Sequence, residues 1–205
     1  MLWYGGDLLR LFTGGVLTPL LTLAFWNNGL KKDKLLLAAL VFVWLGDLGL
    51  LIDKGLIQGI AVGLYFLMHL EFSIKFFGDF QQARKPKIAI GSILVWMAMI
   101  SVLIVGSRVC MNERSLVMHW LVVMYGVMLV SNFAMSLSVT LQRETIAYFL
   151  QMVGYFMILL SDMYFSTSKF CGSLPYPLVL GSALYFPGLY MLYRSRLWLE
   201  QARED

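Results

Sequence analysis

The sequence predicts an all-α integral membrane protein, a polytopic bundle of about seven transmembrane helices. Of its 205 residues, 60% are hydrophobic and only 14% are charged. An ordinary soluble domain has about 45–50% apolar and about 25% charged residues. The apolar residues gather into stretches of about 20, the length that an α-helix needs to cross a bilayer. These stretches lack the two-residue alternation of transmembrane β-strands.

Seven stretches have the length and apolar character of a spanning helix. They are residues 8–28, 34–52, 56–77, 88–107, 116–138, 146–166 and 176–195. Only short gaps separate them, so we expect neighbouring helices to run antiparallel. No polar linker or repeat divides the chain, so we expect one transmembrane domain over residues 1–205.

The basic residues predict the orientation of this bundle. If the loops alternate between the two sides, one side holds 11 of the 16 Lys and Arg residues and the other holds 5. Cytoplasmic loops carry the excess of Lys and Arg, so we expect the N-terminus outside and the C-terminus inside. Loops facing anionic lipid also explain a pI of about 9.1. We therefore expect membrane lipids and no nucleic acid as partners, with a multi-pass location in the bacterial cytoplasmic membrane.

Small residues and proline suggest where the helices pack and bend. Gly55, Gly59 and Gly63 share one helix face, a spacing that lets two helix backbones approach closely. Pro187 lies inside the last stretch and is expected to kink it. The oligomeric state does not follow from either feature.

Two aspartates stand out because ionisable groups within spanning helices are costly and usually face the bundle interior. Asp47 lies in "WLGDLGLLID" and Asp162 in "FMILLSDMYF". Each lies about five residues before the outer end of its stretch, about 7–8 Å below the outer boundary at 1.5 Å per residue. We expect the two carboxyl groups to share one site. In the alternative, each accepts hydrogen bonds from a neighbouring helix or reaches headgroup water.

Several other polar residues are candidates to line this site. His69 is flanked one turn away by Tyr65 and Ser73, and either hydroxyl can satisfy a ring nitrogen. Tyr125 and Tyr185 can donate phenolic hydrogen bonds in a pocket. These tyrosines are individually weak signals because aromatic residues are common at membrane interfaces.

Other polar residues have simpler structural interpretations. Glu71 and Lys75 are four residues apart and are expected to pair on one helix. Ser161 is expected to donate to a carbonyl of its own helix, with orientation of the Asp162 carboxyl as the alternative. No two histidines have a metal-ligand spacing, so we expect no metal.

Two cysteines, Cys110 and Cys171, fall in or near loops on the outer side in this topology. A disulfide between them is conceivable in an oxidising compartment. Two free thiols are the alternative, and the sequence leaves both open.

The ordered polar motifs resemble the YhhN-like lysoplasmalogenase family over roughly residues 15–195. The motifs are Gly46–Asp47 in an early helix, His69 with an aromatic residue three positions later, Ser161–Asp162 in a late helix and Tyr185 in the last. Phe72 replaces an expected Tyr, and "YFPGL" replaces a more polar pattern. Family members typically show eight spanning helices, so this chain is expected to lack the first.

The resemblance implies hydrolysis of the vinyl ether bond of lysoplasmalogens without a cofactor. The products are a fatty aldehyde and a glycerophospho-alcohol. Vinyl ether hydrolysis needs an acid that protonates carbon and a negative group that stabilises the resulting cation, which parallels the two carboxyl groups of glycosidases. One of two neighbouring carboxyl groups in a low-dielectric site is expected to keep its proton near neutral pH. We therefore expect Asp47 and Asp162 to be the catalytic pair and a lysophospholipid in the bilayer to be the substrate.

Two other classes of function use the same residues differently. A proton-coupled transporter of small molecules would use Asp47 and Asp162 as a proton relay, although we find no convincing internal repeat of the kind that transporters often have. A purely structural or binding role predicts that either aspartate can become Asn without functional loss.

Overall fold

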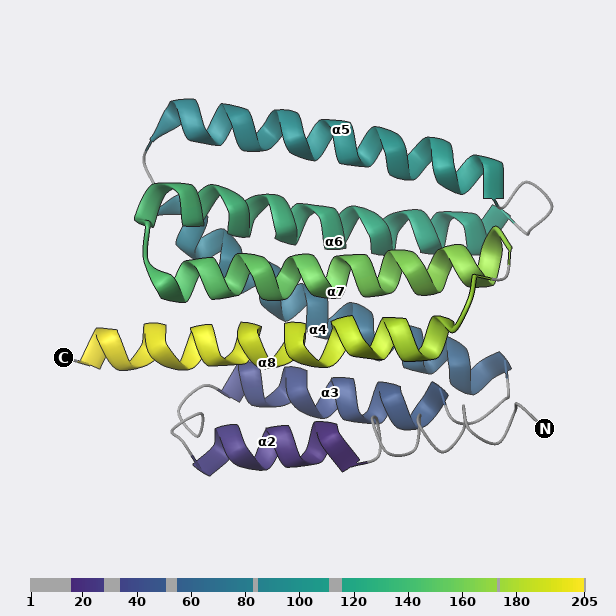
Figure 1. Cartoon of the computed structure of the whole chain (residues 1–205), viewed down its shortest axis with the longest axis horizontal. Helices are drawn as coiled ribbons and strands as arrows, with labels where there is room; N and C mark the ends of the chain where they lie inside the picture. Colours follow the sequence, from purple (N-terminus) through teal and green to yellow (C-terminus); the bar gives the residue numbers. More distant parts are fainter. Residues whose placement is uncertain are drawn as a thin grey trace. The chain divides into compact units, whose positions relative to one another are not determined.

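The computed structural model describes residues 16–27, 34–50, 55–82, 85–110, 116–172 and 174–204. Seven helices and no strand occur within these ranges (Figure 1). The helices are α2 Thr18–Asn27, α3 Lys34–Leu50, α4 Gly55–Gln81, α5 Pro86–Cys110, α6 Leu116–Arg143, α7 Ile146–Phe170 and α8 Pro177–Glu204. The all-helical class predicted from the sequence is therefore confirmed for the described residues.

Each of the seven predicted stretches coincides, in order, with one described helix. The first stretch begins outside the described residues. Within the described ranges, 4 helical stretches are long and apolar enough to cross a membrane. They are Gly59–Gln81, Ile90–Cys110, Val122–Arg143 and Ile146–Ser168. The number of seven spans and the orientation stay predictions, as does the single domain.

From α4 to α8, each helix continues past the end of the apolar stretch that predicted it. α8 continues to Glu204, whereas the predicted stretch ends at residue 195. Hydropathy marks the part of a helix that suits lipid, and polar residues continue the same backbone hydrogen bonds beyond it. Pro187 lies inside α8, where its ring removes the N–H that would bond the carbonyl of residue 183. The bend expected there stays a prediction.

The described residues form two compact units, each of which is described by itself. Unit 1 holds the residues up to Phe72 together with those from Arg196 onward, and unit 2 holds Ser73–Ser195. The division falls inside α4 and inside α8.

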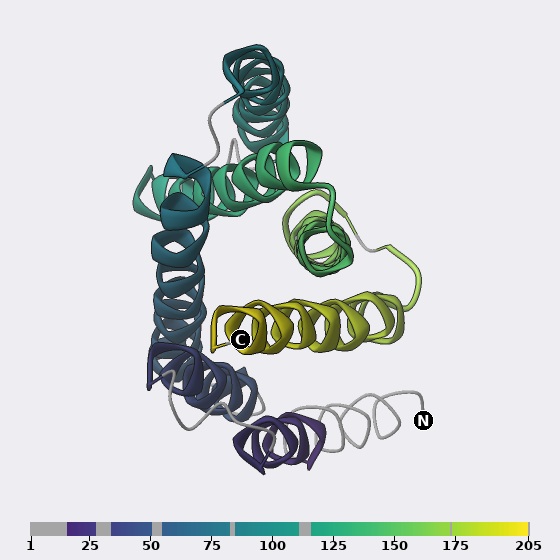
Figure 2. The same ribbon diagram turned by 90° about the vertical axis from the view of Figure 1, so that its left-hand side faces the viewer.

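In unit 2, α6 packs against both α5 and α7, and it lies between them in both views (Figures 1 and 2). Only Glu144 and Thr145 separate α6 from α7, which makes the two helices antiparallel neighbours. Glu144 takes the left-handed conformation, with φ of 52°, and its N–H donates to the Thr140 carbonyl at 3.0 Å. A left-handed residue directly after a helix is a common way to end it and turn the chain.

Within unit 2, α7 and α8 touch backbone to backbone at two glycines. A Cβ on Gly154 would lie 2.6 Å from the Gly188 carbonyl oxygen, and a Cβ on Gly188 would lie 2.7 Å from the Gly154 carbonyl oxygen. Among the described residues, no atom lies within 4 Å of a Cβ at Gly59 or Gly63, so they do not show the contact expected there. Helix packing through the small-residue spacing in α4 stays a prediction, since spacing alone does not say which helix face meets a neighbour.

Gly154→Ala is expected to destabilise the protein by about 1–3 kcal/mol, the usual cost of forcing extra atoms into a packed interface. The clashing atoms belong to backbone, so they cannot move aside as a side chain would. Gly59→Ala is the matched control and should leave stability unchanged or raise it by up to about 1 kcal/mol, since Ala favours helix. Thermal unfolding of the detergent-solubilised variants measures both effects. Equal unfolding temperatures for the two variants would contradict this packing.

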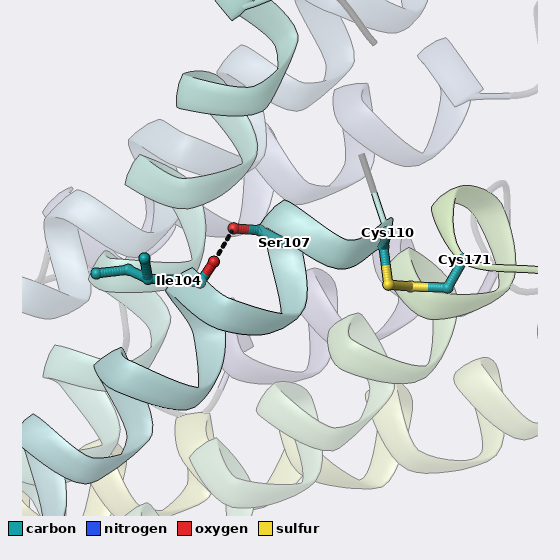
Figure 3. Close-up of a disulfide and its surroundings, with 4 residues drawn as sticks. All are labelled: Ile104, Ser107, Cys110 and Cys171. Atoms are coloured by element: carbon teal, nitrogen blue, oxygen red, sulfur yellow. Dashed lines mark hydrogen bonds between the residues drawn. A yellow bond between two sulfur atoms is a disulfide. The ribbon is translucent and has the colours of Figure 1, made fainter. Parts of the chain in front are cut away.

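Cys110 and Cys171 form a disulfide that joins the end of α5 to the residue after α7 (Figure 3). Just before Cys110, the Ser107 hydroxyl donates to the Ile104 carbonyl within α5 at 2.9 Å. The question that the sequence left open is thereby answered in favour of the disulfide. The bond also requires both helix ends to lie on the same side of unit 2, as the alternating topology predicted.

Unit 1 brings together α2, α3 and the first part of α4. α2 packs against α3. α3 approaches α4 closely where a Cβ on Gly49 would lie 3.0 Å from the Cβ of Ala61. This close approach places Asp47, near the end of α3, within reach of the Tyr65 hydroxyl of α4.

Candidate functional site

Asp47 accepts hydrogen bonds from two other helices of unit 1. The Thr18 hydroxyl of α2 donates to Oδ2 at 2.8 Å, and the Tyr65 hydroxyl of α4 donates to Oδ1. Both carboxyl oxygens therefore act as acceptors, in a part-buried position. The sequence named Asp47 and Tyr65 as candidate site residues, and the structure brings these two together.

Gly46 explains how the Tyr65 hydroxyl reaches Asp47. A Cβ on Gly46 would lie 3.2 Å from the Tyr65 ring, so the ring lies directly over the α3 backbone at the residue before the aspartate. Only glycine leaves this space free. In the Gly46–Asp47 motif, the glycine thus leaves room for the Tyr65 ring, and the aspartate accepts the hydrogen bond of the Tyr65 hydroxyl.

Gly46→Ala is expected to displace the Tyr65 ring by a few tenths of an ångström and to weaken its hydrogen bond to Asp47. Hydrogen bonds to charged groups contribute about 1.5–3 kcal/mol, so weakening this one should lower the temperature of thermal unfolding. Gly63→Ala, in open space on α4, is the control. Thermal unfolding of the detergent-solubilised variants measures the effect, and equal unfolding temperatures for Gly46→Ala and Gly63→Ala would contradict this packing of the Tyr65 ring over Gly46.

Asp162 is the corresponding carboxyl group in unit 2, and it also accepts from a phenol. The Tyr125 hydroxyl of α6 donates to Oδ2 of Asp162 at 3.0 Å. Tyr155 of α7 and Tyr185 of α8 both lie close enough to Tyr125 to interact with it electrostatically. Tyr155 is fully buried and Tyr185 nearly so. Asp162, Tyr125 and Tyr185, all predicted site residues, thus lie in one neighbourhood.

Ser161 forms a hydrogen bond between α7 and α8 beside this carboxyl group. Its hydroxyl donates to the Gly181 carbonyl of α8 at 2.9 Å. The expectation that Ser161 bonds within its own helix is therefore wrong. Gly181 has no side chain to cover its carbonyl, and a Cβ there would lie 3.7 Å from the Ser161 oxygen. The Ser161–Asp162 motif thus combines a helix–helix tether with the carboxyl group that it helps to place.

A second polar cluster of unit 2 lies further along α6 and α7, toward the turn that joins these two helices. The Ser73 hydroxyl donates to Oδ1 of Asn132 at 2.7 Å, and Nδ2 of Asn132 donates to the Tyr155 hydroxyl at 2.7 Å. The Phe76 and Tyr155 rings pack in a T-shaped arrangement, with centroids 5.4 Å apart. Three helices, α4, α6 and α7, are joined by these contacts.

The structure also locates the remaining candidates. His69 is fully buried on α4, and the hydroxyl protons of its neighbours Tyr65 and Ser73 go to Asp47 and Asn132. The pairing of Glu71 with Lys75 stays a prediction. Among the described residues, no cluster of three or more His, Cys, Asp or Glu side chains could hold a metal ion.

Sequence reasoning missed Thr18 and Asn132. Each is a polar residue within an apolar run, which is the signal that could have found them. The signal is weak for Thr18 because a helical threonine commonly bonds back to its own helix, as Thr22 does to the Thr18 carbonyl at 2.8 Å. It is stronger for Asn132, since a side-chain amide in a membrane helix usually bonds across to another helix.

Together these features define a helical membrane protein with two part-buried carboxyl groups, each hydrogen-bonded by a tyrosine. Such groups are suited to proton transfer. Asp47 belongs to unit 1 and Asp162 to unit 2, and their joint action stays a prediction.

The chain belongs to the YhhN family, whose model matches residues 9–196. The resemblance seen in the sequence motifs is thereby confirmed. Searches of curated proteins and of solved structures found no match.

Proposed function

We propose that this protein is a membrane-embedded hydrolase that cleaves the vinyl ether bond of lysoplasmalogens. The products are a fatty aldehyde and a glycerophospho-alcohol such as glycerophosphocholine or glycerophosphoethanolamine. Membership of the YhhN family carries this proposal, since the family resemblance implies that activity. The family match does not favour the alternative of a proton-coupled transporter.

The reaction consumes one water molecule and needs no cofactor. An acid first protonates the vinyl carbon that is not bonded to oxygen. This leaves an oxocarbenium ion at the other vinyl carbon, which is bonded to the ether oxygen. Water adds to that carbon and gives up a proton, forming a hemiacetal. The hemiacetal hydroxyl then gives up its proton and forms the aldehyde C=O as the bond to the glycerol oxygen breaks, and that oxygen takes up a proton and leaves as the alcohol. Two carboxyl groups suffice for these proton transfers, as in glycoside hydrolysis.

The hydrogen bonds of the two aspartates support different roles for them. Both oxygens of Asp47 accept hydrogen bonds, from Thr18 and Tyr65, and this pattern stabilises the ionised form. In the proposal, Asp47 is therefore the negative group that stabilises the oxocarbenium ion and accepts the proton of water. Asp162 is then the acid that protonates carbon. Tyr125, Tyr185, His69 and Ser161 are proposed to surround the substrate or to position these groups.

The proposed substrate is a lysophospholipid that enters from the bilayer. A single alkenyl chain can lie among apolar side chains while its headgroup stays near the outer surface. In the predicted topology both aspartates lie just below that surface, where the vinyl ether joins the glycerol.

The proposed location is the bacterial cytoplasmic membrane, with the N-terminus outside. Two independent observations support this orientation. The excess of Lys and Arg lies on the opposite side from Cys110 and Cys171, and cytoplasmic loops are the basic ones. The two cysteines form a disulfide, and disulfides persist in oxidising compartments outside the cytoplasm.

Cysteine labelling is expected to confirm this orientation. Because both native cysteines are in the disulfide, one introduced cysteine supplies the only free thiol. A membrane-impermeant maleimide added to intact cells should label Pro175→Cys, after α7, and leave Glu144→Cys, before α7, unlabelled. Permeabilised cells should show labelling at both positions. If Glu144→Cys is labelled in intact cells and Pro175→Cys is not, the protein has the opposite orientation in the membrane.

Aldehyde release from a defined lipid tests the proposed activity. The purified protein should release aldehyde from a 1-alkenyl lysophospholipid and none from the 1-alkyl ether of the same chain and headgroup. The alkyl ether has no double bond to protonate, so it controls for contaminating phospholipases and for detergent effects. The absence of aldehyde with every alkenyl lysolipid tried would overturn the proposal for this protein.

A further inference from the structure

Gln151 is a polar residue of unit 2 that the proposed reaction does not use. Its side chain is fully buried in α7. Neither Nε2 nor Oε1 has a hydrogen-bond partner among the described residues. A buried amide without partners is costly, and nearly all such groups in native proteins are satisfied by protein or by ordered water.

The face of α7 on which Gln151 lies points to α6. Gln151, Tyr155 and Asp162 recur at intervals of four and seven residues, which places them on one side of the helix. Asp162 accepts from Tyr125 of α6, and Tyr155 accepts from Asn132 of α6. The Gln151 amide is therefore on the α7 surface that faces α6.

The register of the two helices identifies what lies opposite Gln151. From the Tyr125–Asp162 contact to the Asn132–Tyr155 contact, the chain advances seven residues on α6 and goes back seven on α7. Four residues further in each helix, the same register places Ser136 opposite Gln151. Ser136 is fully buried, and its hydroxyl proton goes to the Phe133 carbonyl at 2.8 Å. Its oxygen can still accept a hydrogen bond.

Direct contacts close the interface on both sides of this position. One turn toward Asp162, Nδ2 of Asn132 lies 2.7 Å from the Tyr155 hydroxyl. One turn the other way, the Thr140 hydroxyl lies 2.7 Å from the Tyr148 carbonyl. Helix turns are only about 5.4 Å apart, so these bridges leave little length for a ligand between them. A water molecule is the group of this size that both donates and accepts hydrogen bonds.

We infer that the Gln151 amide binds a buried water molecule between α6 and α7, opposite Ser136. The water accepts from Nε2 and donates to Oε1 or to the Ser136 hydroxyl oxygen, which gives it the two to four polar partners that buried waters have. Tyr125–Asp162, Asn132–Tyr155 and the water at Gln151 then form successive polar contacts along one helix pair. They extend about 16 Å from Asp162 toward the α6–α7 turn.

The inference does not depend on the proposed hydrolase activity, because it rests on burial, register and hydrogen bonding alone. If the protein is a hydrolase, this water lies inside the membrane on the same helix face as Asp162. The hydrolase proposal can fail while the water site stands, and the reverse also holds.

Water-edited NMR tests the site in the full-length protein. The protein is labelled with ¹⁵N at glutamine and tryptophan and placed in lipid nanodiscs. The transfer of magnetisation from water protons to each side-chain N–H is then measured. The Gln151 Nε2 signal is assigned by its loss in Gln151→Met. It should receive magnetisation from water, and so should the signal of Gln142 at the end of α6. The Trp96 indole N–H, which donates to Ser131 at 2.8 Å, is the protein-bonded comparison.

Two results would overturn the inference. One is a Gln151 signal that receives no transfer from water, so that the amide is dry. The other is transfer from lipid acyl protons in place of water, which would show a lipid at the site. If Gln151→Met does not fold, Gln151→Glu keeps the shape and still removes the amide signal, so the assignment remains secure.

Discussion

Asp162→Asn is expected to lower kcat for aldehyde release about 100-fold or more, the usual range for loss of a general acid. Asn has nearly the shape of Asp but carries no acidic proton, so carbon protonation loses its donor. The Tyr125 hydroxyl keeps an acceptor in the amide oxygen, and Ser161 keeps its bond to the Gly181 carbonyl of α8. Folding should therefore be preserved while turnover falls, which steady-state kinetics and thermal unfolding distinguish.

The matched control is Glu144→Gln, which removes an exposed carboxylate from the same unit. It should leave kcat unchanged. Tyr125→Phe should lie between the two, because it removes one hydrogen bond from Asp162 and leaves the carboxyl group in place. Full turnover in a folded Asp162→Asn protein would eliminate Asp162 as the acid.

Asp47→Asn is expected to reduce kcat about 100- to 1,000-fold, comparable to the loss of one preorganised electrostatic group at a developing charge. An amide carries no negative charge to stabilise the oxocarbenium ion and is no base for water. In addition, one of the two hydroxyl donors, Thr18 or Tyr65, would face the amide NH₂ in place of an oxygen. Some loss of stability should accompany the loss of turnover.

Graded variants separate these two effects at Asp47. Thr18→Val and Tyr65→Phe each remove one hydrogen bond and keep the charge, so each should lower kcat far less than Asp47→Asn does. Ser101→Ala is the control, since this hydroxyl is exposed and donates to the Met97 carbonyl within α5 at 2.9 Å. If Asp47→Asn turns over as quickly as Ser101→Ala, Asp47 has no part in the chemistry.

Much of the fold could be predicted from the sequence because bilayer-spanning length is a strong signal. The stretch 146–166 begins where α7 begins, at Ile146. The helix ends were less predictable, since hydropathy does not report the polar turns that extend α8 to Glu204. The glycine contacts were missed for a different reason. Gly154 and Gly188 lie far apart in the sequence, and only the packed helices bring their backbones together.

The candidate site was predictable in its acids and less so in their partners. Asp47 and Asp162 stood out because a carboxyl group in an apolar run is costly. Their phenol donors come from other helices, so no local spacing could link Tyr65 to Asp47 or Tyr125 to Asp162. The space that Gly46 leaves for the Tyr65 ring likewise depends on the contact between α3 and α4.

Hydrolysis in D₂O tests the central claim most directly. Acid-catalysed opening of a vinyl ether places one solvent-derived hydrogen on the carbon next to the new aldehyde carbon. Mass spectrometry of the promptly trapped aldehyde should therefore show one deuterium on that carbon, and the glycerophospho-alcohol should contain none bound to carbon. Asp162→Asn should give far less of this product under the same conditions. Aldehyde without deuterium on that carbon, or no aldehyde from the wild-type protein, would contradict hydrolysis by carbon protonation.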